Sequence, residues 1–66
     1  MDEGVKKIFE DSAIRYENTG RAHEKSGKYN LAANDYRFSS VEYEGYGNKK
    51  KAREMKDKQK EMESKL

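Results

Sequence analysis

The stretch HEKSGKYNLAANDYRFSSVEYEGYG, residues 23–47, decides how this chain folds. Its tyrosines recur every seven residues, at Tyr29, Tyr36 and Tyr43, and small residues occupy the positions between them. Seven residues are about two turns of an α-helix, so these rings share one face. We therefore predict a helix over residues 28–45 whose tyrosine face is buried.

A second apolar stripe, Leu31, Phe38 and Val41, lies on the same predicted helix and is rotated away from the tyrosines. A helix with two apolar stripes is expected to have neighbours on two sides. The segment should thus be the middle member of a three-helix arrangement.

The preceding residues predict a long first helix over residues 3–26. Asp2 or Glu3 can open it, because a negative charge is favourable at a helix N-terminus, and Gly27 is suited to end it. Apolar, small and aromatic residues recur at three- and four-residue steps and define its expected packing face: Val5, Ile8, Phe9, Ser12, Tyr16, Thr19 and His23.

A third helix is predicted over residues 49–65, after a turn at Gly45 and Gly47. Its thin apolar edge consists of Ala52, Met55, Gln59, Met62 and Leu66. Short connections favour antiparallel neighbours, so we predict one all-α domain, 1–66, folded as a small antiparallel three-helix bundle. The third helix is expected to dock on the Leu31, Phe38 and Val41 stripe.

Composition limits how stable such a chain can be. Only 32% of its 66 residues are hydrophobic and 42% are charged, so a core alone is marginal and help from another copy or a partner is expected. Cysteine is absent and no apolar run is long enough for a membrane span. We expect a soluble, cytoplasmic protein.

No catalytic or metal-binding constellation emerges from the sequence, and no cofactor is expected. His23 is the only histidine, and no Asp, Glu or Cys stands three or four residues after it to complete a metal pair on the helix. The serines lack a base partner apart from that histidine. We therefore predict a protein that is not an enzyme.

The residues of the first two helices resemble a tetratricopeptide (TPR) repeat, which pairs two antiparallel helices over 34 residues. The matching positions within 13–46 are Tyr16, Gly20, His23, Gly27, Tyr29, Ala32, Tyr36 and Ser39. Thr19 stands where the family usually has Leu, and no proline closes the repeat. The run from Gly27 to Tyr36 is also similar to the MIT domain, a three-helix bundle of comparable size. Both resemblances imply a module that binds protein segments.

The two resemblances imply two different binding surfaces. An MIT-like groove between the second and third helices would be lined by Leu31, Phe38, Val41, Met55 and Met62. A TPR-like concave face would use Ile14, Glu17, Arg21, Glu24 and Lys25. Glu17 and Arg21 stand where the carboxylate-clamping version of the family has Lys and Asn, so the resemblance does not support recognition of a C-terminal carboxylate.

The expected partner is a protein or peptide segment, or another copy of the chain. Nucleic acid is the weaker alternative, because the net charge is only +2. That alternative would use the basic third helix, including the run Lys49–Lys51, together with exposed tyrosines. Buried tyrosines would instead favour the protein-binding interpretation.

Overall fold

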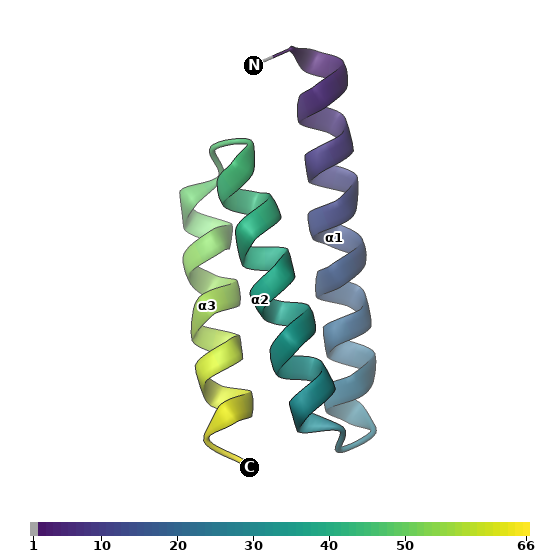
Figure 1. Ribbon diagram of the computed structural model, residues 1–66, viewed down its shortest axis with the longest axis vertical. Helices are drawn as coiled ribbons and strands as arrows, with labels where there is room; N and C mark the ends of the chain where they lie inside the picture. Colours follow the sequence, from purple (N-terminus) through teal and green to yellow (C-terminus); the bar gives the residue numbers. More distant parts are fainter. Residues whose placement is uncertain (1) are drawn as a thin grey trace.

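Three helices make up the fold of the computed structural model, which describes residues 2–66 (Figure 1). They are α1 (Glu3–Lys25), α2 (Tyr29–Gly45) and α3 (Lys49–Glu63). α2 packs against both of the other helices and runs antiparallel to them, so α1 and α3 are parallel (Figure 1). The predicted all-α three-helix bundle is confirmed, although α3 ends at residue 63 rather than 65.

The two interhelical turns have the same hydrogen-bond pattern. After α1, the Gly27 and Lys28 amides donate to the carbonyls of Glu24 and His23, and Gly27 has a positive φ of 73°. After α2, Gly47 (φ 93°) and Asn48 repeat both bonds. This is a Schellman motif, whose left-handed residue is normally glycine. The glycines of the sequence therefore determine where both helices end.

Side-chain caps determine where the outer two helices begin. The Asp2 carboxylate accepts from the amide of Gly4 at 2.7 Å and from that of Val5 at 3.3 Å. Asn48 accepts from the amide of Lys51 at 3.1 Å. Each bond satisfies an amide that has no partner within the helix.

Small residues bring all three backbones close together. The Ser39 hydroxyl donates to the carbonyl of Ala13 in α1, and the Ser40 hydroxyl donates to that of Ala52 in α3, both at 2.8 Å. A Cβ added at Gly20 would lie 3.1 Å from the Tyr36 ring, so α1 and α2 approach closely there. The buried core consists of Ala13, Ala32, Ala33, Tyr36, Tyr43, Ala52, Met55 and Met62.

The predicted docking face of α3 is wrong. Leu31, Phe38 and Val41 are 41%, 42% and 59% exposed, and α3 packs on the side of α2 that carries Ser40 and Tyr43. The physical reason is that α1 and α3 both approach the tyrosine side, where alanine and serine allow short interhelical distances. α1 and α3 therefore both pack on the same side of α2.

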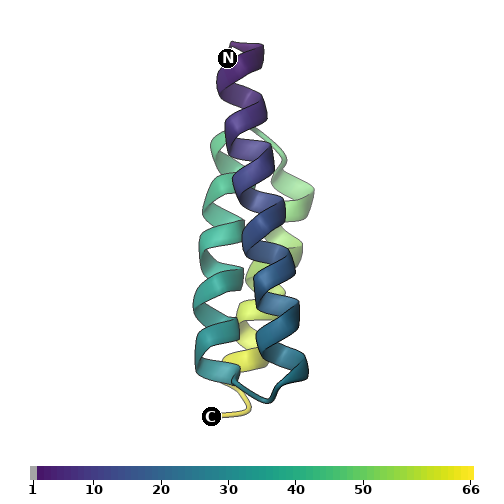
Figure 2. The ribbon, with the colours of Figure 1, turned by 90° about the vertical axis from the view of Figure 1, so that its right-hand side faces the viewer.

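The predicted packing face of α1 is wrong, because none of its seven residues is buried and the buried face is rotated from it by about one residue. Its buried residues are Ala13, Glu17 and Gly20, while Val5 and Ile8 are exposed. The first turn of α1 projects beyond the turn that joins α2 to α3 (Figures 1 and 2). No helix within residues 2–66 combines the length and apolarity needed to cross a membrane.

We predict that Ala32→Leu destabilises the fold by about 1–3 kcal/mol, because Ala32 is fully buried and extra methyl groups overfill a packed site. Thermal unfolding followed by circular dichroism measures the effect. Ala22→Leu, at an exposed position of α1, is the control and should change little. An unchanged midpoint for Ala32→Leu would contradict the observed helix packing.

Candidate functional site

Glu17 links the three helices on the tyrosine side of α2. Its carboxylate accepts from the Tyr43 hydroxyl at 2.6 Å and from the Lys51 ammonium at 3.1 Å. The Lys51 ammonium also lies 5.4 Å from the centre of the Tyr43 ring. Only 5% of Glu17 is exposed, so hydrogen bonds must replace the water that a carboxylate loses on burial.

The same arrangement recurs one heptad away. Glu24 accepts from the Tyr36 hydroxyl at 2.7 Å and from the Lys58 ammonium at 3.1 Å. The Lys58 ammonium lies 5.5 Å from the centre of the Tyr36 ring. We call these two sets the Glu–Tyr–Lys triads. Their members are Glu17, Tyr43 and Lys51 in one and Glu24, Tyr36 and Lys58 in the other.

The triads shift the pKa values of their members in opposite directions. Burial alone would raise the pKa of the Glu17 carboxyl, but the bonds from Tyr43 and Lys51 outweigh it and lower the pKa. For Glu24, the bond from Tyr36 is the largest cause of a lowered pKa. Burial, followed by the bond to the carboxylate, raises the pKa of both phenols well above their usual range. Both carboxylates are therefore held in the charged form.

The predicted concave face is thus largely occupied from within the chain. Glu17 and Glu24 are bound by α2 and α3, and Arg21 forms an ion pair with Glu17. Ile14 and Lys25 are exposed on α1. Because its carboxylates already have donors, this face serves packing more than it serves recognition.

The opposite side of α2 carries exposed apolar residues. Leu31, Phe38 and Val41 form this surface, which we call the outer face. The Phe38 ring lies 5.4 Å from that of Tyr16 in α1, and the Arg37 guanidinium stacks 4.6 Å from the Phe38 centroid. These contacts hold Phe38 in place but leave it available to a partner.

The expected groove that combined this stripe with two methionines does not exist. Met55 and Met62 are 3% and 0% exposed, because they fill the core between α2 and α3. The structure therefore places Leu31, Phe38 and Val41 on the surface and both methionines beneath it. Only three of the five predicted groove residues could contact a partner.

Cations of α3 border the outer face. Lys49, Arg53 and Lys56 line a shallow groove together with Glu44 of α2, and Lys56 lines a second groove with Val41. Lys60 follows four residues after Lys56, on the same edge of the helix. We call Lys49, Arg53, Lys56 and Lys60 the α3 basic edge.

His23 has a partner that spacing within α1 could not reveal. Its Nδ1 lies 2.6 Å from the carboxylate of Asp35 in α2, and both side chains are half-buried. Residues 2–66 contain no group of three or more His, Cys, Asp or Glu side chains that could hold a metal ion. The pair joins α1 to α2 beside the outer face.

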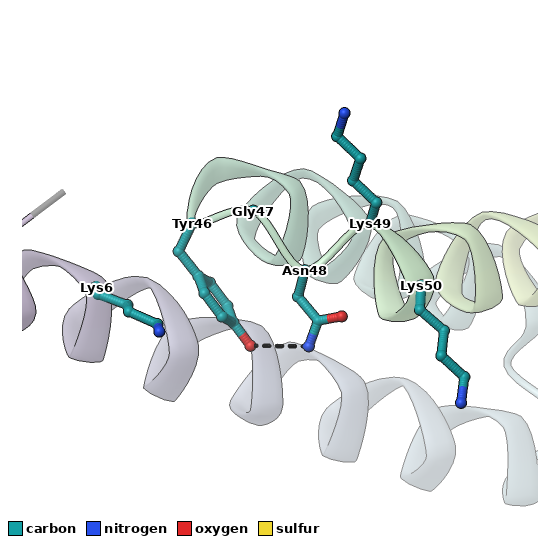
Figure 3. Close-up of a pocket in the computed structure, with 6 residues that line it drawn as sticks. All are labelled: Lys6, Tyr46, Gly47, Asn48, Lys49 and Lys50. Atoms are coloured by element: carbon teal, nitrogen blue, oxygen red, sulfur yellow. Dashed lines mark hydrogen bonds between the residues drawn. The ribbon is translucent and has the colours of Figure 1, made fainter.

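A separate basic pocket lies at the turn between α2 and α3. Tyr46 accepts a hydrogen bond from the Asn48 amide at 3.3 Å there, and Lys6, Lys49 and Lys50 line the rest of the pocket. The ammonium groups of Lys49 and Lys50 point in opposite directions (Figure 3). The cations thus do not converge on one ligand position.

The expectation of exposed tyrosines for stacking nucleic acid bases is wrong. Tyr36 and Tyr43 are buried, Tyr29 and Tyr46 are partly buried, and Tyr16 is 36% exposed. The rings that would stack bases instead fill the core and donate to carboxylates. Of the two features that favoured nucleic acid binding, only the basic third helix remains.

Sequence reasoning missed the Glu–Tyr–Lys triads, although a signal was present. The two members of each type lie seven residues apart in the sequence: Glu17 and Glu24 in α1, Tyr36 and Tyr43 in α2, and Lys51 and Lys58 in α3. Carboxylates, phenols and ammonium groups on three helices therefore have the same spacing.

The chain matches no family model, no curated protein and no solved structure, so the assignment of a site rests on geometry.

We predict that Tyr43→Phe lowers the free energy of unfolding at neutral pH by about 1.5–3 kcal/mol, since it removes a bond to a charged, buried acceptor. Tyr16→Phe, at an exposed ring, is the control. Urea unfolding of both variants measures the difference.

The effect of Tyr43→Phe should depend on pH. Because the pKa of Glu17 is lower in the folded chain, its stabilisation is present above the ordinary value of 4.5 and disappears as the pH falls through the folded value. The difference between wild type and Tyr43→Phe should therefore shrink as the pH falls below 4.5 and through the lowered pKa of the folded chain. A difference that is constant with pH would contradict the role given to the Glu17 carboxylate.

Proposed function

We propose that this chain is a non-enzymatic interaction module that binds a protein segment or another copy of itself on the outer face of α2. One observation carries the proposal: three large apolar side chains, 41–59% exposed, lie on a helix whose other side is fully packed. Apolar surface grouped on one face, rather than scattered, is typical of interaction sites.

The sequence offset between residues of α1 and α3 that contact each other supports a TPR-like module over an MIT-like one. Both ion pairs that join these helices, Glu17–Lys51 and Glu24–Lys58, connect residues 34 positions apart. That offset equals the length of a TPR repeat. α3 would accordingly take the place of the first helix of a following repeat.

The other candidate surfaces have less support. The tyrosine side has its carboxylates bound by internal donors, so a ligand there would first have to displace the Glu–Tyr–Lys triads. Nucleic acid binding loses its stacking platform because the tyrosines are packed into the core. The outer face needs no rearrangement to accept a partner.

We predict that Phe38→Ser abolishes partner binding while leaving the fold intact, because Phe38 is only half-buried. Affinity capture from the native source, quantified by mass spectrometry, compares wild type with this variant. Ile8→Ser removes a large apolar side chain that is also exposed, but on α1, and is the matched control. Proteins retained by wild type and Ile8→Ser but lost from Phe38→Ser are the expected partners.

Self-association is measured in the same series. Light scattering over a hundredfold range of concentration separates a binding site for another copy from one for a different protein. If Phe38→Ser retains every protein that wild type captures and has the same oligomeric state, the outer face is not the binding surface.

A further inference from the structure

We infer that the outer face accepts an amphipathic helix of a different protein, with carboxylates along the edge that lies over α3. This inference rests on the proposed function and adds the chemistry of the partner. It depends on two adjacent features, the apolar stripe of α2 and the α3 basic edge.

The α3 basic edge forms no ion pair within the described chain, although Glu44 lines the grooves beside it. Its four cations recur at i, i+4, i+7 and i+11, and none has a carboxylate of residues 2–66 within ion-pair distance. The lysines on the tyrosine side differ, since Lys51 and Lys58 are both bound to carboxylates of α1. A charged row on one helix edge, left without partners, indicates complementary charge from outside.

Helix electrostatics strengthen this argument at Lys49. Cations are unfavourable at the positive end of a helix, yet α3 begins with Lys49, Lys50 and Lys51 and has no acidic residue in its first turn. Glu17 offsets the charge of Lys51. A carboxylate of the partner helix would offset that of Lys49.

The dimensions of the outer face fit a helix. The eleven residues from Leu31 to Val41 are separated by ten steps of 1.5 Å, a rise of about 15 Å, which corresponds to about three turns of a partner helix. Val41 and Lys56 line the same groove, so neighbouring positions of one helix can make an apolar contact and an ion pair. Half-covered side chains of this kind form the ridges and grooves in which helices pack.

A second copy of the chain supplies too little negative charge. Asp35, on the α1 side of the outer face, is already bound to His23. It lines a groove between α1 and α2 together with Arg15, whose positive charge offsets the negative charge of the carboxylate. That leaves Glu42 and Glu44 to face the four cations of the α3 basic edge. An anionic membrane or nucleic acid would in turn be repelled by Glu44, which lines both grooves beside the α3 basic edge. A helix can instead place its acidic groups only where cations lie.

The test is selection of surface-displayed helical peptides, about four turns long, in which Leu, Glu, Lys and Ala are equally frequent at every position. The full chain is the bait. Enriched peptides should carry Leu at i, i+3 or i+4 and i+7, with an excess of Glu over Lys along one edge. Fluorescence anisotropy then gives the affinity of the best peptide for each variant of the chain.

Two variants separate the contributions. The triple variant Arg53→Glu, Lys56→Glu, Lys60→Glu should weaken binding by more than about tenfold, because like charges would then face each other. The control, Lys6→Glu, Lys28→Glu, Lys50→Glu, changes the net charge equally at exposed sites elsewhere and should bind as wild type does. Phe38→Ser should abolish binding.

The outcomes distinguish this inference from the proposed function. Peptides that require Phe38 but show no excess of Glu, and that bind the triple variant normally, overturn the inference and leave the proposed function standing. Failure to select any peptide that requires Phe38, together with an oligomeric state that Phe38→Ser leaves unchanged, overturns both. Tighter binding to phosphatidylserine vesicles or to an oligonucleotide, or dimerisation through the outer face, also overturns the inference.

Discussion

The buried carboxylate of Glu17 is the constraint on which the rest of the structure depends. It lies on α1, accepts from a phenol of α2 and an ammonium of α3, and so fixes all three helices relative to one another. A charged group at 5% exposure is tolerated only when its acceptor sites are filled. The requirement is directional, so it selects one rotation of each helix, which apolar packing alone would leave less well defined.

Repetition of the Glu–Tyr–Lys triad extends that constraint along the bundle. Since each helix contributes a member every seven residues, the two triads can form together only in one register. This explains how a chain with 32% hydrophobic residues builds a defined core: tyrosine supplies a large apolar ring and a polar end in the same side chain. Alanine and serine on α2 then allow its neighbours to approach.

The arrangement also explains why the outer face is exposed. α1 and α3 both contact the tyrosine side of α2, because both must reach its phenols, and this leaves Leu31, Phe38 and Val41 without a covering helix. The polar core and the exposed apolar stripe thus have one cause. Packing uses one side of a single helix, and the proposed binding surface is the opposite side.

Local features of the fold could be predicted from the sequence. Gly27 and Gly47 end helices because both adopt a positive φ, and the heptad tyrosines mark a buried face because helical spacing aligns them. The packing face of α1 was harder to predict, because Val5, Ile8 and Tyr16 share a helical period with one another but lie about one residue's rotation away from the buried Ala13, Glu17 and Gly20. Spacing indicates that residues share a face, and it does not show whether a neighbour reaches them.

The sequence by itself determined the three helices, their boundaries to within two residues and the burial of the tyrosine face, because capping, glycine conformation and helical period act between residues close in the chain. Only the tertiary structure decided which apolar stripe is covered, which carboxylates meet which phenols, and that His23 pairs with Asp35. Those outcomes depend on side chains 12 to 34 residues apart, whose relative rotation is fixed only when all three helices pack together.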